Sequence, residues 1–174
     1  MKGSSKRTRS SSHWVVAGAL IFGPWQLQLW QSPRTRQPVN MPISLAAGHV
    51  TTPEFKVIKD RYIILVVAKK RLPFDVLCCM MGLNQEPLSR YNCHQEPLVQ
   101  ANWTVSSDHH TVAQGTSRDV RGGFFGNKDV GRYLGDFYGE SGKKYTLDVD
   151  FTEDATALAV TDPHLSVQIS NESY

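Results

Sequence analysis

Alternation of apolar and polar positions dominates the second half of the chain. In residues 99–106 every second side chain is apolar, with Trp103 among them, and residues 145–151 repeat the pattern. Because successive side chains of a strand point to opposite faces, each segment predicts a strand with one buried face. Further strands are expected at 55–57, 61–68, 111–114, 130–138 and 165–169, with a strand or short helix at 76–81 and a brief strand at 158–160.

Turns and runs between these segments complete the predicted fold. Residues 61–68, RYIILVVA, are apolar almost throughout, which indicates a central strand. In residues 130–138, Tyr133 and Phe137 are expected on one face. Asp108-His109-His110 predicts the turn of a hairpin. About seven or eight strands, with no convincing helix among them, predict an all-β fold, an antiparallel β-sandwich of immunoglobulin-like or jelly-roll type.

The longest uncharged stretch lies near the N-terminus. Residues 14–30, WVVAGALIFGPWQLQLW, follow a start with four basic residues and no acidic one. A helix of about 17 residues spans roughly 25 Å, close to the ~30 Å hydrocarbon core of a membrane. The predicted organisation is a disordered cytoplasmic tail (1–12), a transmembrane helix (13–31), a Pro-containing spacer (32–42) and a periplasmic domain (43–174).

A cleaved signal peptide is the alternative to a retained anchor. The nearest small-x-small pattern, Ala17-Gly18-Ala19, lies inside the apolar run, where cleavage is not expected. Pro24 and Gln26 weaken the second half of a membrane helix and favour a signal. The third interpretation of this segment is a buried or interfacial helix in a soluble protein. The basic residues before the run place the N-terminus in the cytoplasm, so the predicted location is the inner membrane, with a single span.

Charge separates the N-terminal segment from the domain. Of 19 Lys and Arg residues, six lie in residues 1–37, which hold no acid, so the rest carries 13 basic against 16 acidic residues, a net charge of −3. Neutralising phosphates requires a basic surface. No nucleic-acid partner is therefore predicted, and no cofactor is expected.

Three cysteines, Cys78, Cys79 and Cys93, lie in the part predicted to be exported. An oxidising compartment favours one disulfide, in which Cys93 pairs with either Cys78 or Cys79 and closes a loop of about 15 residues. The remaining thiol is expected to be buried. The spacing does not match a structural zinc site.

Candidate chemistry is sparse. Asp148, Asp150 and Asp154 resemble the start of a calcium loop, but Glu153 stands where the loop needs glycine, so a solvated strand face is the preferred interpretation. His49 has no spaced partner in the sequence. No motif supplies a nucleophile with its base, so no catalytic residue is assigned and no enzyme is predicted.

The segment Gly122-Gly123-Phe124-Phe125-Gly126-Asn127 is the strongest candidate for binding. Phe124, Phe125 and Asn127 would lie in a flexible glycine-rich loop and present two rings to a partner. The alternative is that one phenylalanine closes the end of the sandwich while the glycines supply positive φ angles.

The arrangement resembles small exported bacterial proteins of unknown function. The shared features are the basic start, the apolar segment, a spacer of PVNMPISLAAG character and a β domain with EFKVIKDRYIILV, ANWTV and GKKYTLDVDFTEDATALAVTDPHLSVQI, together residues 38–170. The resemblance implies a periplasmic location in a Gram-negative bacterium. Some proteins of this build are immunity or inhibitor proteins against toxins that act in the periplasm.

The sequence therefore predicts a membrane-anchored periplasmic protein that binds a protein partner or an envelope component. Two other functions compete with this one. The first is an envelope hydrolase or metal-dependent enzyme centred on Asp148, Asp150 and the histidines. The second is a structural subunit of a membrane complex.

Overall fold

The computed structural model describes residues 36–83, 93, 97–118 and 122–170. Contacts divide the chain into two units, Met1–Ser32 and Pro33–Tyr174. The predicted transmembrane helix over residues 13–31 lies outside the described residues. Within the described part, no helix is long and apolar enough to span a membrane.

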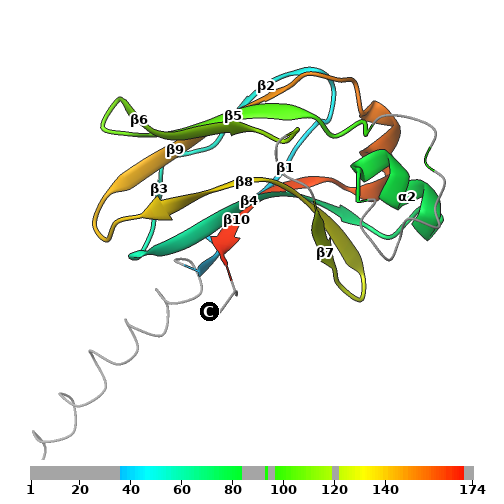
Figure 1. Cartoon of the computed structure of the whole chain (residues 1–174), viewed down its shortest axis with the longest axis horizontal. Coiled ribbons are helices and arrows are strands. Elements are labelled where there is room, and N and C mark those ends of the chain that lie inside the picture. The colour runs from blue at the N-terminus through cyan, green and yellow to red at the C-terminus, as the bar shows by residue number, and fades with distance from the viewer. Residues whose placement is uncertain (1–35, 84–92, 94–96, 119–121, 171–174) are drawn as a thin grey trace, which may run out of the picture. The chain divides into compact units, whose positions relative to one another are not determined.

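The second unit is a sandwich of two antiparallel sheets (Figure 1). One sheet has the strand order β1-β10-β4-β8-β7, and the other has the order β2-β9-β5-β6, with β3 also pairing with β9. The strands are Val39–Pro42 (β1), Gly48–Thr51 (β2), Phe55–Lys56 (β3), Asp60–Lys69 (β4), Ala101–Ser107 (β5), His110–Thr116 (β6), Gly123–Phe125 (β7), Asp129–Gly139 (β8), Lys144–Phe151 (β9) and His164–Ile169 (β10). The predicted all-β antiparallel sandwich is confirmed.

The two clearest alternations belong to β5 and β9, which pair with each other and form one wall of the core. In β5, Trp103 and Val105 are buried while Asn102 is exposed. In β9, Leu147 and Val149 are fully buried. Each buried Leu or Val contributes roughly 1.5–3 kcal/mol of hydrophobic stabilisation, so this period-two pattern fixes which face of each strand points inward.

A β-bulge in β8 changes the predicted orientation of one aromatic residue. Ile64 pairs with Gly135 and Leu65 pairs with Tyr133, so Leu134 is the extra residue. Leu134 and Phe137 are buried in the core, whereas Tyr133 is half-buried. The prediction that Tyr133 and Phe137 share a face is wrong, because a bulge shifts the alternation by one residue.

The bulge also joins the two sheets. The indole Nε1–H of Trp103 donates a hydrogen bond of 2.8 Å to the Leu134 carbonyl across the sandwich. The Trp103 ring lies so close to Gly135 that a Cβ there would stand 2.2 Å from it. The Trp103 ring therefore requires glycine at position 135, directly after the bulge in β8.

The run at 76–81 belongs to a helix, α2 (Phe74–Met81), and not to a strand. Pro73 precedes the helix, and Gly82, with φ of 73°, ends it in the left-handed conformation. Leu77, Cys78 and Met81 are its buried residues. The helix alternative predicted at 76–81 is therefore confirmed. The run at 158–160 lies in a 3₁₀ helix, η2 (Thr156–Thr161), so the brief strand predicted there is wrong.

Cys79 and Cys93 form the disulfide, with Cα atoms 5.4 Å apart. Cys78 is a free and fully buried thiol, and this burial raises its pKa. Neighbouring residues on a helix are rotated by about 100°, so Cys78 points into the core while Cys79 points towards the chain that carries Cys93.

The described residues form ten strands where seven or eight were expected, because three short edge strands were not predicted. β1 occupies the last four residues of the predicted spacer and pairs with β10, so the sandwich begins before residue 43. β2 pairs with β9, and β7 pairs with β8. Each has at most four residues, too few to display a periodic pattern.

The turn between β5 and β6 is confirmed as a hairpin connection. Ser107 pairs with His110, which leaves Asp108 and His109 as a two-residue loop with φ of 50° and 64°. Positive φ at both central residues is the conformation that suits the twist of a two-residue hairpin.

Candidate functional site

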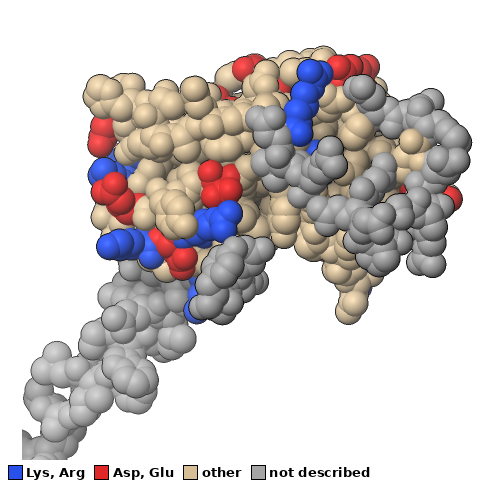
Figure 2. All heavy atoms as spheres, in the orientation of Figure 1, with Lys and Arg blue, Asp and Glu red and all other residues tan. Residues whose placement is uncertain are grey.

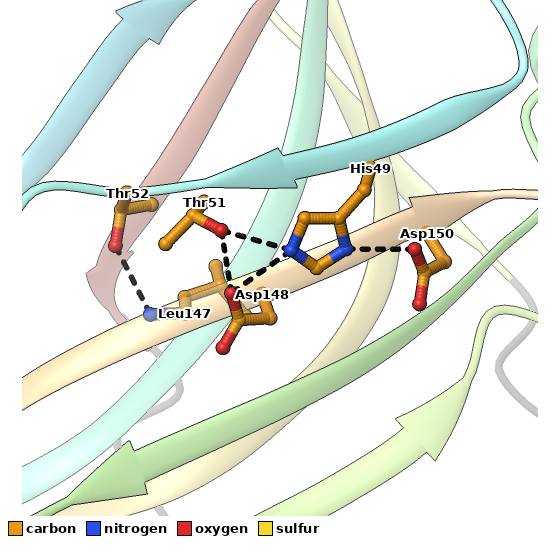
Figure 3. Close-up of polar contacts among 6 residues, drawn as sticks. All are labelled: His49, Thr51, Thr52, Leu147, Asp148 and Asp150. Atoms are coloured by element: carbon orange, nitrogen blue, oxygen red, sulfur yellow. Dashed lines mark hydrogen bonds and ion pairs between the residues drawn. The ribbon is translucent and has the colours of Figure 1, made fainter.

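Two groups of side chains lie in arrangements that could support function. One is a polar group on the exposed face of β2 and β9, which we call the histidine cluster: His49, Thr51, Asp148 and Asp150 (Figure 3). The other is an aromatic group at the end of the sandwich where α2 and β7 lie, which we call the end cluster: Phe74, Phe125 and Lys70.

The pairing of β2 with β9 creates the histidine cluster. His49 lies directly opposite Asp150, and Thr51 lies opposite Asp148. Residues two apart on a strand share a face, so all four side chains project to the same side. Thr52 points the other way and is buried, where its hydroxyl oxygen accepts a 3.0 Å hydrogen bond from the Leu147 backbone N–H (Figure 3).

His49 bridges the two carboxylates. Its Nδ1 lies 2.7 Å from Asp150 Oδ1, and its Nε2 lies 3.2 Å from Asp148 Oδ1 and 2.9 Å from Thr51 Oγ1. The Thr51 hydroxyl donates to Asp148 Oδ1 at 2.6 Å. The hydrogen bond to Asp150, followed by the nearby charge of both carboxylates, raises the pKa of His49. A protonated ring can donate from both nitrogens at once, whereas a neutral ring can donate from only one.

The cluster contains a hydroxyl, an imidazole and a carboxylate in the order of a nucleophile, a base and an orienting group. However, the side chain of His49 is 54% exposed and that of Asp150 is 63% exposed. Catalysis by such groups depends on oriented donors in a site that excludes water, and an open strand face does not exclude water. The contacts of His49 therefore fit a structural role, in which they hold edge strand β2 on β9, better than they fit an active site.

The aspartates proposed as weak metal candidates are not brought together. Asp148 and Asp150 contact opposite nitrogens of His49, while Asp154 accepts a 2.9 Å hydrogen bond from the Thr156 backbone N–H. This bond lowers the pKa of Asp154. Among the described residues, no group of three His, Cys, Asp or Glu side chains is placed to hold a metal ion.

The end cluster begins with β7. Phe124 and Phe125 lie in a strand and therefore point to opposite faces, although a flexible loop was expected. The Phe125 ring contacts Phe74 of α2, with centroids 5.6 Å apart, yet Phe125 is 44% exposed. Asn127 is exposed in the turn between β7 and β8. Of the predicted binding residues, the structure thus places Phe125 against α2 and Phe124 on the other side of its sheet.

Lys70 stabilises the end cluster through contacts with both α2 and the β7–β8 turn. Its Nζ lies 5.2 Å from the centroid of the Phe74 ring, within the range of a cation–π interaction, and donates a 2.6 Å hydrogen bond to the Gly126 carbonyl. Val76 of α2 is also exposed, at 43%. The segment after β4, helix α2 and the distant strand β7 thereby hold an exposed apolar surface in a fixed conformation.

One end of the sandwich carries charges of both signs. At the end with β3 and the turn between β8 and β9, acidic and basic side chains lie close together (Figure 2). Ion pairs that join Arg61 to Asp136 and Lys143 to Glu140, both at 2.9 Å, belong to the charged end. Exposed pairs of this kind contribute about 0–1 kcal/mol each.

One buried charge lies behind the end cluster. Arg132 on β8 is 6% exposed and donates hydrogen bonds to the carbonyls of Gly82 at 3.1 Å and Ser117 at 2.8 Å. Burial lowers its pKa. Its contact with the Gly82 carbonyl, next to the C-terminus of α2, is the location where a helix favours a cation. Arg132 therefore fixes the position of α2 relative to β8.

Sequence reasoning missed the partners of His49. The residues that meet in the histidine cluster are about 100 positions apart, with 101 between His49 and Asp150, and their register follows from strand pairing. The alternation of His49 and Thr51 with Gly48 and Val50 was the available signal for an exposed polar face.

Comparison with known proteins adds information on the fold. No protein-family model matches the sequence, and no curated protein matches it. The crystal structure of GEBA250068378 from Sulfurospirillum deleyianum is similar, with a TM-score of 0.58 at 14% sequence identity over 77% of this chain and 98% of that chain. A likeness at this identity shows a shared fold alone. The bacterial origin of that protein agrees with the resemblance to bacterial β proteins.

Proposed function

We propose that this chain is a non-enzymatic, membrane-anchored interaction protein whose β-sandwich binds another protein in the periplasm. Residues 13–31 would supply the anchor. The sandwich would belong to the immunoglobulin-like or jelly-roll group. An immunity or inhibitor protein against an envelope-acting toxin is one member of this functional class.

The exposed ring of Phe125 is the observation that carries the proposal. Binding energy in protein interfaces concentrates in a few aromatic and arginine side chains that are surrounded by a less critical rim. Phe125 is 44% exposed, and Phe74 and Lys70 hold the position of its hairpin. Because these side chains are ordered before binding, association would lose less conformational entropy than a flexible loop would lose.

Basic groups beside the end cluster suggest the character of the partner. The Arg71 guanidinium donates to the Val160 carbonyl at 3.3 Å, and Val160 is 56% exposed. Among the described residues, neither Lys70 nor Arg71 forms an ion pair with a carboxylate. A partner that presents an apolar side chain next to acidic residues would complement this surface and would associate faster at low salt.

Site-specific photocrosslinking in living cells tests the proposal. A photoreactive phenylalanine analogue is placed at Phe125 and, as a matched control, at Val112, which is 46% exposed on β6 of the other sheet. We expect a discrete adduct from position 125 and none of the same mass from position 112. The adduct formed from a second probe at Val76 should weaken in the F125A background. Equal adducts from positions 112 and 125, or no adduct from position 125, would contradict the proposal.

A further inference from the structure

The outer face of the sheet β1-β10-β4-β8-β7 carries two adjoining cavities. One, of about 380 Å³, lies between β1, β10 and β7, and the other, of about 490 Å³, lies where the chain enters β1 and leaves β10. Both are lined by Gln37 and Gln168, so they meet at these two side chains. Together they form one continuous depression, which we call the outer groove.

Neutral amide side chains line the outer groove. Gln37, Asn40 and Gln168 contribute three amide groups, each with two N–H donors and one carbonyl acceptor. A 3.0 Å hydrogen bond from Gln37 Nε2 to Ser166 Oγ, with Ser166 fully buried, holds Gln37 in place. The groove can therefore donate and accept hydrogen bonds without requiring a charge on its ligand.

Phe124 supplies an aromatic surface in this polar setting. It lies opposite Gly131, and a Cβ on Gly131 would stand 2.1 Å from its ring. The ring therefore lies against the backbone of β8, which only glycine permits, and it lines the groove. Phe125, its neighbour in β7, faces away to the end cluster, so the two rings belong to different surfaces.

Two of the charged groups at this end of the groove pair with each other. Lys69 forms an ion pair with Asp162, which lowers the pKa of that carboxyl. Nδ1 of His164 lies 2.8 Å from the Asp162 carbonyl, to which it donates. The groove lining holds Arg36 and Lys69 against three aspartates, an excess of one negative charge that disfavours a polyanion.

We propose that the outer groove binds a neutral linear oligosaccharide. Sugar rings present apolar C–H faces that pack on an aromatic ring and hydroxyls that both donate and accept, which matches Phe124 surrounded by amides. Two adjoining cavities of about 380 and 490 Å³ offer room for more than one linked sugar unit. This site is separate from the end cluster and does not depend on the protein partner proposed above.

Titration of the full-length protein with cellotetraose and with chitotetraose tests the inference. The protein is kept in a detergent without a sugar headgroup, and binding is measured by calorimetry and by saturation-transfer NMR. We expect saturable binding of at least one probe at or below about 1 mM. F124A should weaken it at least about tenfold, and N40A should weaken it by about two- to tenfold.

The neighbouring variant F125A is the matched control, because it removes a ring of the same strand that lies outside the groove. It should leave sugar affinity unchanged while it weakens the adduct formed by the probe at Val76. N40A, at an exposed side chain, keeps the test valid if F124A does not fold. Absence of saturable binding up to about 10 mM, or equal binding by wild type, F124A and N40A, would overturn the inference. Either result would leave the protein-binding proposal standing.

Discussion

At the scale of single residues, His49 shows how a strand edge gains a pH-dependent contact. Its ring lies between two carboxylates on β9 and bonds to both. Protonation gives each carboxylate an N–H donor, and loss of the proton leaves one nitrogen as an acceptor that faces another acceptor. The Thr51 hydroxyl is the only other donor in the histidine cluster, and it is already directed at Asp148.

We predict that His49 titrates above the ordinary histidine value of about 6.5. Because its pKa is raised in the folded state, its stabilising effect is complete below about 6.5 and is lost as pH rises through the folded pKa. An NMR titration of the imidazole measures this value directly. D150N should lower the pKa of His49, whereas D154N, whose carboxyl contacts Thr156, should not. A pKa of His49 that is equal in wild type and D150N would refute this assignment.

Trp103 connects the two sheets through a hydrogen bond. We predict that W103F lowers the free energy of unfolding by about 1–3 kcal/mol, because the buried Leu134 carbonyl loses its donor. Urea unfolding followed by circular dichroism gives the change in midpoint. Y138F removes a hydroxyl from a side chain that is 75% exposed and should change stability by less than about 0.5 kcal/mol. Equal effects of the two substitutions would contradict the prediction.

At the scale of elements, a strand could be predicted from sequence where its own residues alternate between apolar and polar. Bulges and short edge strands could not be predicted, because they depend on the strand that pairs with them. β5 and β9 were predicted because their own residues alternate. The bulge at Leu134 depends on the pairing of β8 with β4, and β1 gains its strand character from β10. Helix α2 did carry a local signal, in Pro73 before it and Gly82 after it.

The same reasoning applies to the candidate sites. The sequence singled out Phe124, Phe125 and Asn127 because two rings lie among glycines, but a strand, and not a loop, separates the two rings onto opposite faces. The histidine cluster could not be predicted, because its members meet only through the register of β2 with β9. Long-range register is a property of the packed core and leaves no local pattern.

Two residues in the β5–β6 turn have backbone conformations that lower the stability of the protein, and substitution can relieve this strain. Asp108 and His109 both have positive φ, which residues with a Cβ adopt unfavourably. We predict that the double substitution D108N/H109G raises the free energy of unfolding by about 1 kcal/mol, because Asn-Gly is the preferred pair for this turn. Thermal unfolding should shift upward by about 2–4 °C.

The control for this turn is Gly142, which has φ of 87° and no atom within 4 Å of an added Cβ. G142A should therefore destabilise only through its backbone conformation, by about 1 kcal/mol in the opposite direction. No increase in stability for D108N/H109G, with the expected decrease for G142A, would show that the strain at Asp108 and His109 is negligible.

At the scale of the whole molecule, the oxidation state of the three cysteines depends on the compartment in which the sandwich folds. Cys79 and Cys93 form a disulfide, and Cys78 is buried. Such a bond persists outside the cytosol and is reduced within it. A mass-tagging reagent for thiols, applied to protein taken directly from cells, therefore distinguishes the two locations without any reporter fusion.

For an exported sandwich we predict no reactive thiol in the native protein, one after denaturation and three after denaturation with reductant. Cys78 accounts for the single thiol because unfolding exposes it, and the disulfide protects the other two cysteines until it is reduced. The same chain without residues 1–31 is the matched control, since it lacks the predicted export segment and should show three thiols after denaturation alone. Three thiols in the denatured, unreduced full-length protein would place the sandwich in a reducing compartment. The anchor and its periplasmic partner would then be excluded together, whereas the groove and the end cluster, which depend on the fold alone, would still require their own tests.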